Sequence, residues 1–154
     1  MSRTVAHKPD ELDAKILELL QRDARTSSRE IAKRLRVATG TVSARINRLT
    51  EEGIIRGYTA ILDGTKLGYE FTVITLIQVE GGHLVEVERE LAKVEGVGSV
   101  YDITGEFDAA IIARFKDRAF LDAFIKSISA TRYVRRTVTS VVLNVVKEEL
   151  RIKA

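Results

Sequence analysis

The 154-residue sequence contains no cysteine, which excludes disulfides, thiolate metal sites and a cysteine nucleophile. It also lacks any apolar run close to the roughly 20 residues that a membrane-spanning helix needs. Residues 1–10 have no apolar core of the kind found in signal peptides. These absences predict a cytoplasmic protein. The content of 45% hydrophobic and 31% charged residues is typical of a globular chain of one medium or two small domains.

Sequence motifs for catalysis and for cofactor binding are missing as well. His7 and His83 lie in different halves of the chain, and neither metal-ligand spacing nor a glycine-rich phosphate loop occurs. Asp102 and Asp108 could face each other across a hairpin, but paired carboxylates at such positions are usually solvated. The sequence therefore predicts that the protein is not an enzyme and holds neither a cofactor nor a metal.

Positive charge is concentrated in the first half of the chain. The net charge is only +3, yet residues 21–48 hold eight Lys or Arg against two Asp or Glu, whereas residues 61–154 hold 13 against 14. This asymmetry favours an anionic partner for the first half. Charge alone is equally compatible with basic side chains that merely solvate helix faces.

Helical spacing dominates residues 10–53. A first helix follows Pro9 and the capping candidate Asp10, and a second begins at the S-x-x-E capping box of residues 27–30. Residues 36–38 form a tight turn, Thr39 is the predicted N-cap of a third helix, and Gly53 suits its C-terminal cap. The β-rich residues 54–62 predict a short wing or hairpin strand, and residues 63–68 a linker.

Residues 71–146 read as β-α-β-β-α-β. Strands are expected over 71–79, 97–104, 109–115 and 134–146, and apolar stripes predict helices over 84–94 and 120–128. The fold class is therefore α+β: a winged helix-turn-helix joined to a ferredoxin-like sandwich. The expected domains are a DNA-binding domain over 1–62, with a short wing or linker strand, and an effector-binding and oligomerisation domain over 69–154.

The third helix presents a polar outer face. With Val42, Ile46 and Leu49 inward, small residues permit close approach to a DNA groove, and Asn47 and Arg48 suit bidentate contacts to base edges. Basic residues of the preceding helix suit the phosphate backbone, Lys33 and Arg34 among them. The predicted DNA-contacting residues are Ser28, Arg29, Arg36, Thr39, Thr41, Ser43, Ala44, Arg45, Asn47 and Arg48.

Two of these residues have plainer interpretations. Asn47 could be an ordinary solvent-facing side chain, and Arg45 could form an ion pair with Glu52 or Asp23. The residues together are stronger evidence for DNA binding than any one of them. A three-helix unit without a DNA-binding role would not need the basic residues of 21–48 beside an outer face of the third helix that is almost free of acidic residues.

The sequence resembles the Lrp/AsnC, or feast/famine, regulators of prokaryotes. The resemblance is carried by Leu12-Asp13, Ile16-Leu17, Arg25-x-Ser27, Glu30-Ile31-Ala32, Thr41-Val42-x-x-Arg45-Ile46-x-Arg48-Leu49 and Glu52-Gly53-Ile54-Ile55, and it extends over the β-α-β-β-α-β tail. It implies a homodimer that assembles into tetramers or octamers, binds pseudo-palindromic promoter DNA and responds to an amino acid or related small molecule.

The resemblance also implies an effector site around the turn between the second and third strands of the tail. Gly105 lets backbone amides approach a ligand carboxylate, and Asp108 could accept an α-ammonium. From the residues alone, a plain hairpin in which Asp108 satisfies the amides of its own turn is favoured. The predicted effector-binding residues are Thr104, Gly105, Phe107, Asp108, Tyr133, Arg135, Thr137 and Thr139.

Two other classes of function fit part of the chain. An amino-acid-binding module that partners an enzyme would explain the tail but not the basic helix-turn-helix. An RNA-binding sheet should expose aromatic residues, whereas the strands over 97–104 and 134–146 are mainly aliphatic. Residues 141–146 are apolar on both faces of a strand, which predicts that sheets of two copies pack together.

Overall fold

The computed structural model describes residues 8–153, which form two compact units. The first contains residues up to Ile61 and the C-terminal segment from Glu148, and the second runs from Leu62 to Lys147. The side chain of Gln21 holds the C-terminal segment in the first unit, because its amide exchanges two hydrogen bonds with the backbone of Ile152, at 2.8 and 2.9 Å. No helix within residues 8–153 has the length and apolarity to cross a membrane.

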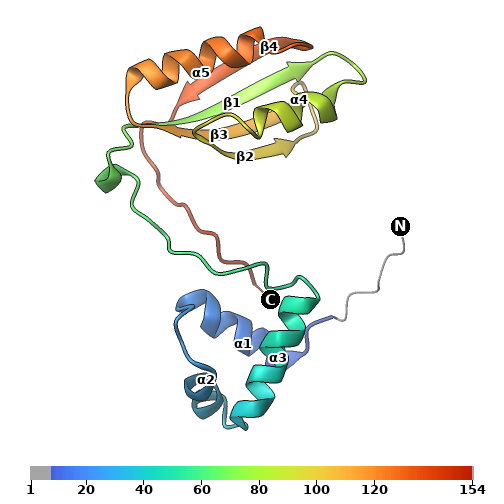
Figure 1. The fold of residues 1–154 in the computed structure, drawn as a ribbon, viewed down its shortest axis with the longest axis vertical. Coiled ribbons are helices and arrows are strands. Elements are labelled where there is room, and N and C mark those ends of the chain that lie inside the picture. Colours follow the sequence, from blue (N-terminus) through green and yellow to red (C-terminus); the bar gives the residue numbers. More distant parts are fainter. Residues whose placement is uncertain (1–7, 154) are drawn as a thin grey trace. The chain divides into compact units, whose positions relative to one another are not determined.

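The first unit is built from three helices, α1 (Glu11–Arg22), α2 (Ser28–Leu35) and α3 (Thr39–Glu51) (Figure 1). Asp10 caps α1 by accepting the backbone N–H of Asp13, and the hydroxyl of Ser27 caps α2 by accepting that of Glu30. The apolar residues at helical spacing meet in one core, where burial of each large side chain contributes about 1.5–3 kcal/mol. The most buried are Ile16, Ile31, Val42 and Leu49.

Three local predictions for this unit are wrong. The N-cap of α3 is Ala38 rather than Thr39, because the Ala38 carbonyl accepts the first helical bonds. The Glu30 carboxylate pairs with Arg34 at 2.6 Å instead of completing a capping box. Residues 54–62 form no strand, since no neighbouring segment in the described range pairs with them; the N–H groups of Ile54 and Ile55 both donate to the Leu49 carbonyl at the end of α3.

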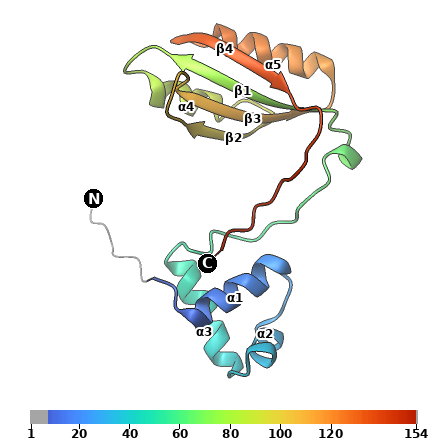
Figure 2. The ribbon, with the colours of Figure 1, turned by 180° about the vertical axis from the view of Figure 1, so that it is seen from behind.

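The second unit confirms the β-α-β-β-α-β prediction. After the short helix η1 (Thr65–Leu67) come β1 (Phe71–Val79), α4 (Leu84–Leu91), β2 (Val97–Asp102), β3 (Ala109–Phe115), α5 (Arg118–Ala130) and β4 (Val134–Val141). The strands form one antiparallel sheet in the order β2-β3-β1-β4. Both helices cover one face of the sheet, and the other face is seen in Figure 2.

Two strands are shorter than the sequence predicts. The last ladder bonds of β4 are made beside the start of β1, where the N–H of Val142 donates to the Thr72 carbonyl at 2.8 Å. Residues 143–146 lie beyond Phe71, where β1 begins, and have no strand to pair with in the described range. In the same way β2 ends at Asp102, which pairs with Ala109, the first residue of β3.

Alternation along the strands divides the sheet into two apolar faces. The helix-covered face carries the core, including Val73, Ile77 and Ile111, all fully buried. The opposite face carries apolar side chains too, and register places Leu76 opposite both Val138 and Ala110. We call the exposed or half-buried residues Ile74, Leu76, Ile112 and Val138 the open face.

Candidate nucleic-acid interface and effector turn

A buried carboxylate ties α1 to α3. The Asp13 side chain is fully buried, and its oxygens accept hydrogen bonds from Arg45 at 3.1 Å and from Arg48 at 2.5 Å. Arg45 also pairs with Asp10, and this guanidinium holds the pKa of the Asp10 carboxyl at about 2. Because both carboxylates lie at the start of α1, the pairs fix the rotation of α3 about its own axis.

This network corrects the predicted orientation of Arg48. The sequence places Arg48 on the outer face with Asn47, but its guanidinium turns inward and is only half-exposed. Its Nε atom is buried without a hydrogen-bond partner in the described part of the chain. The expected partners of Arg45, Glu52 or Asp23, are also wrong, since Asp10 and Asp13 take their place.

The remaining outer face of α3 is small and uncharged. Gly40, Ala44 and Asn47 follow one another at i, i+4 and i+7, and all three are exposed or half-buried. Thr41 is exposed beside them, whereas Ser43 is half-buried. Such a face allows the backbone of a helix to approach a groove wall closely while Asn47 can bond with a base edge.

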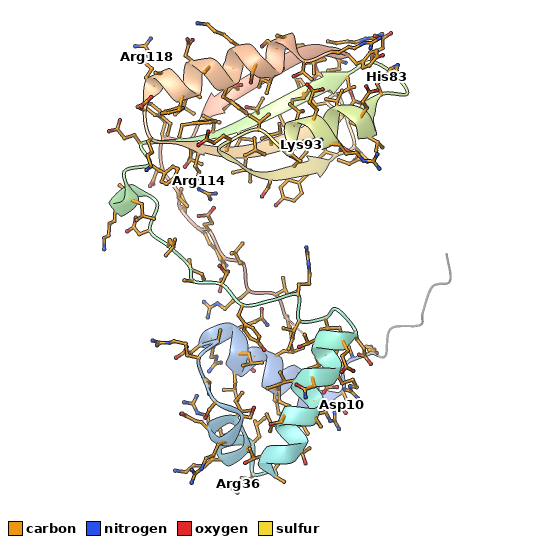
Figure 3. The ribbon with its side chains drawn as sticks, viewed as in Figure 1. Asp10, Arg36, His83, Lys93, Arg114 and Arg118 are labelled. Carbon is orange, nitrogen blue, oxygen red and sulfur yellow. The ribbon has the colours of Figure 1, made fainter. Side chains whose placement is uncertain are left out.

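A shallow groove of about 920 Å³ lies beside this face, between α2 and the start of α3. Arg29, Lys33 and Thr39 line it, and neither Arg29 nor Lys33 has a carboxylate partner among the described residues. Ser28 is half-buried in the first turn of α2. Arg36 ends α2 in a left-handed conformation with φ of 56°, and Figure 3 shows its position at that end. Hydroxyls, amides and unpaired cations in such a groove suit phosphate oxygens.

The turn between β2 and β3 is anchored by Asp108. One carboxylate oxygen of Asp108 accepts the backbone N–H of Val79 at 2.8 Å, so it binds the end of β1 rather than the amides of its own turn. Thr104 and Gly105 are exposed, and Gly105 has a φ of 126°, which favours glycine. The Asp108 carboxylate is therefore held in place at the side of an accessible glycine.

Three residues that the sequence did not single out lie at the same turn. Arg136 of β4 pairs with Glu106 at 3.0 Å, and its guanidinium lies 5.5 Å from the centre of the Phe107 ring. The Gln78 side chain reaches the Glu106 carbonyl at 3.5 Å. The alternation of β4 could have indicated Arg136, since it shares the open face with Val138.

The predicted effector residues of β4 do not join this cluster. Thr137 lies within 3.4 Å of Ser129 of α5, and Thr139 bonds with buried Thr75 at 3.0 Å, so both face the helix-covered side. Arg135 is exposed beside the register shift in β4. Tyr133 has a φ of 68° and stacks on the His83 ring, with centroids 3.5 Å apart.

Comparison with known proteins gives a consistent result. Residues 9–56 match a winged helix-turn-helix DNA-binding model, and residues 72–152 match the Lrp/AsnC ligand binding domain. An uncharacterised HTH-type transcriptional regulator of Pyrococcus abyssi is 46% identical over 94% of this chain and 98% of its own. The HTH-type transcriptional regulator FL11 of the same organism is 38% identical, over 94% of this chain and 97% of its own.

Solved structures show the same fold. The structure of Escherichia coli AsnC has a TM-score of 0.88 at 26% identity and covers 96% of this chain and 100% of its own. A transcriptional regulator from Neisseria meningitidis, crystallised as an L-Met complex, has a TM-score of 0.86 at 24% identity and covers 94% and 96% of the two chains.

Fold and site together define a DNA-binding transcriptional regulator with a helix-turn-helix unit and a ligand-binding unit, not an enzyme. The chain belongs to the Lrp/AsnC family.

Proposed function

We propose that the protein reads specific duplex DNA sequences with α3, and that an amino acid or related small molecule at the Gly105–Asp108 turn changes its assembly or DNA affinity. The observation that carries the proposal is the outer face of α3, small and uncharged, beside a groove with unpaired cations. The 13 residues of α3 span about 20 Å along the helix axis, and the major groove, about 12 Å wide, admits an α-helix.

Within this proposal the DNA-contacting residues have separate tasks. Thr41, Ser43, Ala44 and Asn47 face the bases, with Asn47 as the bidentate reader of adenine. Ser28, Arg29, Arg36 and Thr39 hold the phosphate backbone, together with Lys33. Arg45 and Arg48 act indirectly, because their ion pairs with Asp13 set the orientation of α3. The test is selection of bound fragments from random DNA at two salt concentrations, repeated with variants.

Asn47→Ala and Lys33→Ala are expected to weaken DNA binding in different ways. Loss of Asn47 should cost about 1–3 kcal/mol on the selected sequence and relax the preference at one base position, because a base contact carries sequence information. Loss of Lys33 should weaken all sequences alike and reduce the slope of log affinity against log salt by about 1. Fluorescence anisotropy at several salt concentrations measures both effects.

Lys126→Ala is the matched control for Lys33. Lys126 lies on α5 and pairs with Asp122, so its removal should change neither affinity nor salt slope. If Asn47→Ala lowers affinity equally on every sequence, then Asn47 is a backbone contact and the assignment of α3 as the reading helix loses its basis.

The effector part of the proposal rests on the geometry of the turn. Gly105 leaves open space where a side chain would stand, so its backbone is accessible to a carboxylate. Asp108 and Glu106 supply anionic oxygens, and Arg136 supplies a cation, within one cluster. A ligand with both an ammonium and a carboxylate matches this set. The regulator of similar fold from Neisseria meningitidis was crystallised with L-Met, which makes amino acids the first compounds to test.

Asp108→Asn is expected to weaken amino-acid binding about tenfold or more, because a neutral amide replaces the charged partner of the α-ammonium. The fold should survive, since the asparagine carbonyl can still accept the Val79 N–H. Calorimetry with each of the twenty amino acids measures the binding. Asp117→Asn is the control, because Asp117 likewise accepts backbone N–H groups, at the start of α5. No heat from any amino acid with folded wild-type protein would end this part of the proposal.

We further propose that two copies pair through the open face. Ile74 is 43% exposed in the single chain, and Leu76, Ile112 and Val138 extend the apolar surface across three strands. Soluble monomers rarely expose such a continuous patch. Pairing presents two copies of α3 to one duplex, in keeping with pseudo-palindromic sites. An RNA-binding sheet is disfavoured, because Tyr101 is the single exposed aromatic on the described strands.

A further inference from the structure

A cavity of about 580 Å³ lies in the second unit, at the end of the sheet where the linker enters β1. Figure 3 labels Arg114, one of its lining residues, at this end and His83 at the other. Phe115 in the cavity pairs with Phe71, whereas Ala109, next to Asp108, pairs with Ile77. Residues 109–113 of β3 therefore separate the cavity from the effector turn, and the six steps from Asp108 to Arg114 span about 20 Å.

One wall of the cavity depends on the absence of a side chain at Gly96. A Cβ atom there would lie 2.5 Å from the Phe115 ring and 2.9 Å from the Arg114 carbonyl, and the φ of 86° disfavours any other residue. The Gly96 carbonyl accepts the N–H of Arg114 at 2.9 Å. The backbone of this loop therefore packs directly on the Phe115 ring and holds that wall of the cavity in place.

The lining combines aromatic rings with a cationic rim. Phe115 and Phe124 pack with their ring centroids 4.9 Å apart, Phe120 is 56% exposed at the mouth, and Tyr69 closes the linker side. The Lys116 ammonium lies 5.6 Å from the centre of the Tyr69 ring. Because the Lys116 ammonium lies beside these aromatic rings, the cavity favours an anion with an apolar body.

The cavity also touches the linker. The N–H of Tyr69 donates to the Gly64 carbonyl at 2.9 Å, and that of Gly68 donates to the Thr65 carbonyl at 3.0 Å, so Tyr69 belongs to the folded base of the linker around η1. A ligand packed against the Tyr69 ring would restrain this base. Binding in the second unit then has a direct physical effect on the segment that leads to the DNA-binding unit.

We propose that this cavity is a second small-molecule site, separate from the effector turn, for an aromatic carboxylate whose ring packs among Phe115, Phe120 and Phe124. Its carboxylate pairs with Lys116. The occupied site stiffens the base of the linker at Tyr69. The proposal stands independently of the one for the effector turn, because the two sites share no residue.

The test uses 3-phenylpropionate as the probe and its primary amide as the uncharged analogue, with the full-length chain. Wild type should bind the acid with a Kd of about 1 mM or tighter, as expected for a small fragment, and the amide more weakly. The acid should also slow amide exchange at Gly68 and Tyr69. Lys116→Gln should weaken binding of the acid about threefold to fivefold. Ala123→Trp, which fills the cavity from an exposed position of α5, should abolish it.

Matched variants distinguish binding in this cavity from binding elsewhere on the protein. Lys126→Gln and Ala130→Trp change exposed or half-buried residues of the same helix outside the cavity and should bind like wild type, as should Asp108→Asn. Absence of binding to folded wild type overturns the proposal. So does loss of binding in Asp108→Asn with retention in Ala123→Trp, which would locate the probe at the effector turn. A change of molecular mass in Ala123→Trp also overturns it, because a second copy would then cover the cavity.

Discussion

Asp13→Ala is expected to lower the free energy of unfolding of the first unit by about 3 kcal/mol, at the lower end of the range for breaking a buried ion pair. Asp13 is fully buried and accepts from Arg45, Arg48 and the N–H of Asp10. Its removal leaves two guanidiniums without this partner, at 26% and 34% exposure. Partial access of both to water keeps the loss below that of a fully buried pair.

Amide hydrogen exchange in the full-length chain measures the effect, because it reports on each unit separately. Core amides of α3 around Leu49 should exchange about 100-fold faster than in wild type. In Asp13→Asn the exchange rate should lie between those of wild type and Asp13→Ala, because the asparagine carbonyl still accepts hydrogen bonds but the negative charge is gone. Asp23→Ala is the control: its pair with Arg25 is exposed, so exchange of the α3 core amides should stay close to the wild-type rate. Unchanged protection in Asp13→Ala would show that helix packing alone orients α3.

The Asp13 network marks the limit of what the sequence predicts about the first unit. Helical spacing and the caps at Asp10 and Ser27 are patterns within a few residues, and the structure confirms them. The partnership of Asp13 with Arg48 joins residues 35 positions apart and depends on how α1 crosses α3. A helical projection treats α3 alone, so it places Arg48 outside although the neighbouring helix draws it inward.

For the strands too, the sequence predicts what depends on neighbouring residues and misses what depends on pairing with a distant strand. The bounds of β1 and β3 are predicted correctly, because each is an apolar run, and the two strands pair with each other over 71–77 and 109–115. The prediction for β4 is too long because residues 142–146 are as apolar as a strand. The pairing of β4 with β1 ends at Val141, and this limit depends on the length of β1 and not on the sequence of β4.

At the effector turn, a register shift explains the misassigned residues. Val79 pairs with Val134 and Gln78 with Arg136, so Arg135 is an extra residue in β4. A bulge of one residue exchanges the faces of every side chain that follows. Arg136 therefore lies with Glu106 and Phe107, whereas Thr137 turns to α5. Alternation back from Val138 places Arg136 on the same face, but nothing in the sequence marks Arg135 as the extra residue.

Leu76→Arg is expected to convert the protein into a monomer and to lower its affinity for a two-half-site DNA about 100-fold or more, because the second α3 no longer binds intramolecularly. Leu76 lies at the centre of the open face, opposite Val138 on one side and Ala110 on the other. In a dimer its arginine replacement would bury an unpaired charge in an apolar interface. In the single chain the side chain is half-buried, so the guanidinium can reach water and the sheet should still fold.

Light scattering coupled to size exclusion gives the mass of the assembly, and anisotropy on one-half-site and two-half-site duplexes gives the affinities. Val85→Arg is the matched control, because it introduces the same charge at a 58% exposed residue of α4, on the helix-covered side of the sheet. It should retain the wild-type mass and DNA affinity. Leu76→Arg should bind both duplexes with the same weak affinity, which a general loss of folding would not produce. A folded Leu76→Arg variant with the mass of wild type would mean that copies associate through another surface, and the two-copy arrangement on DNA would need a different basis.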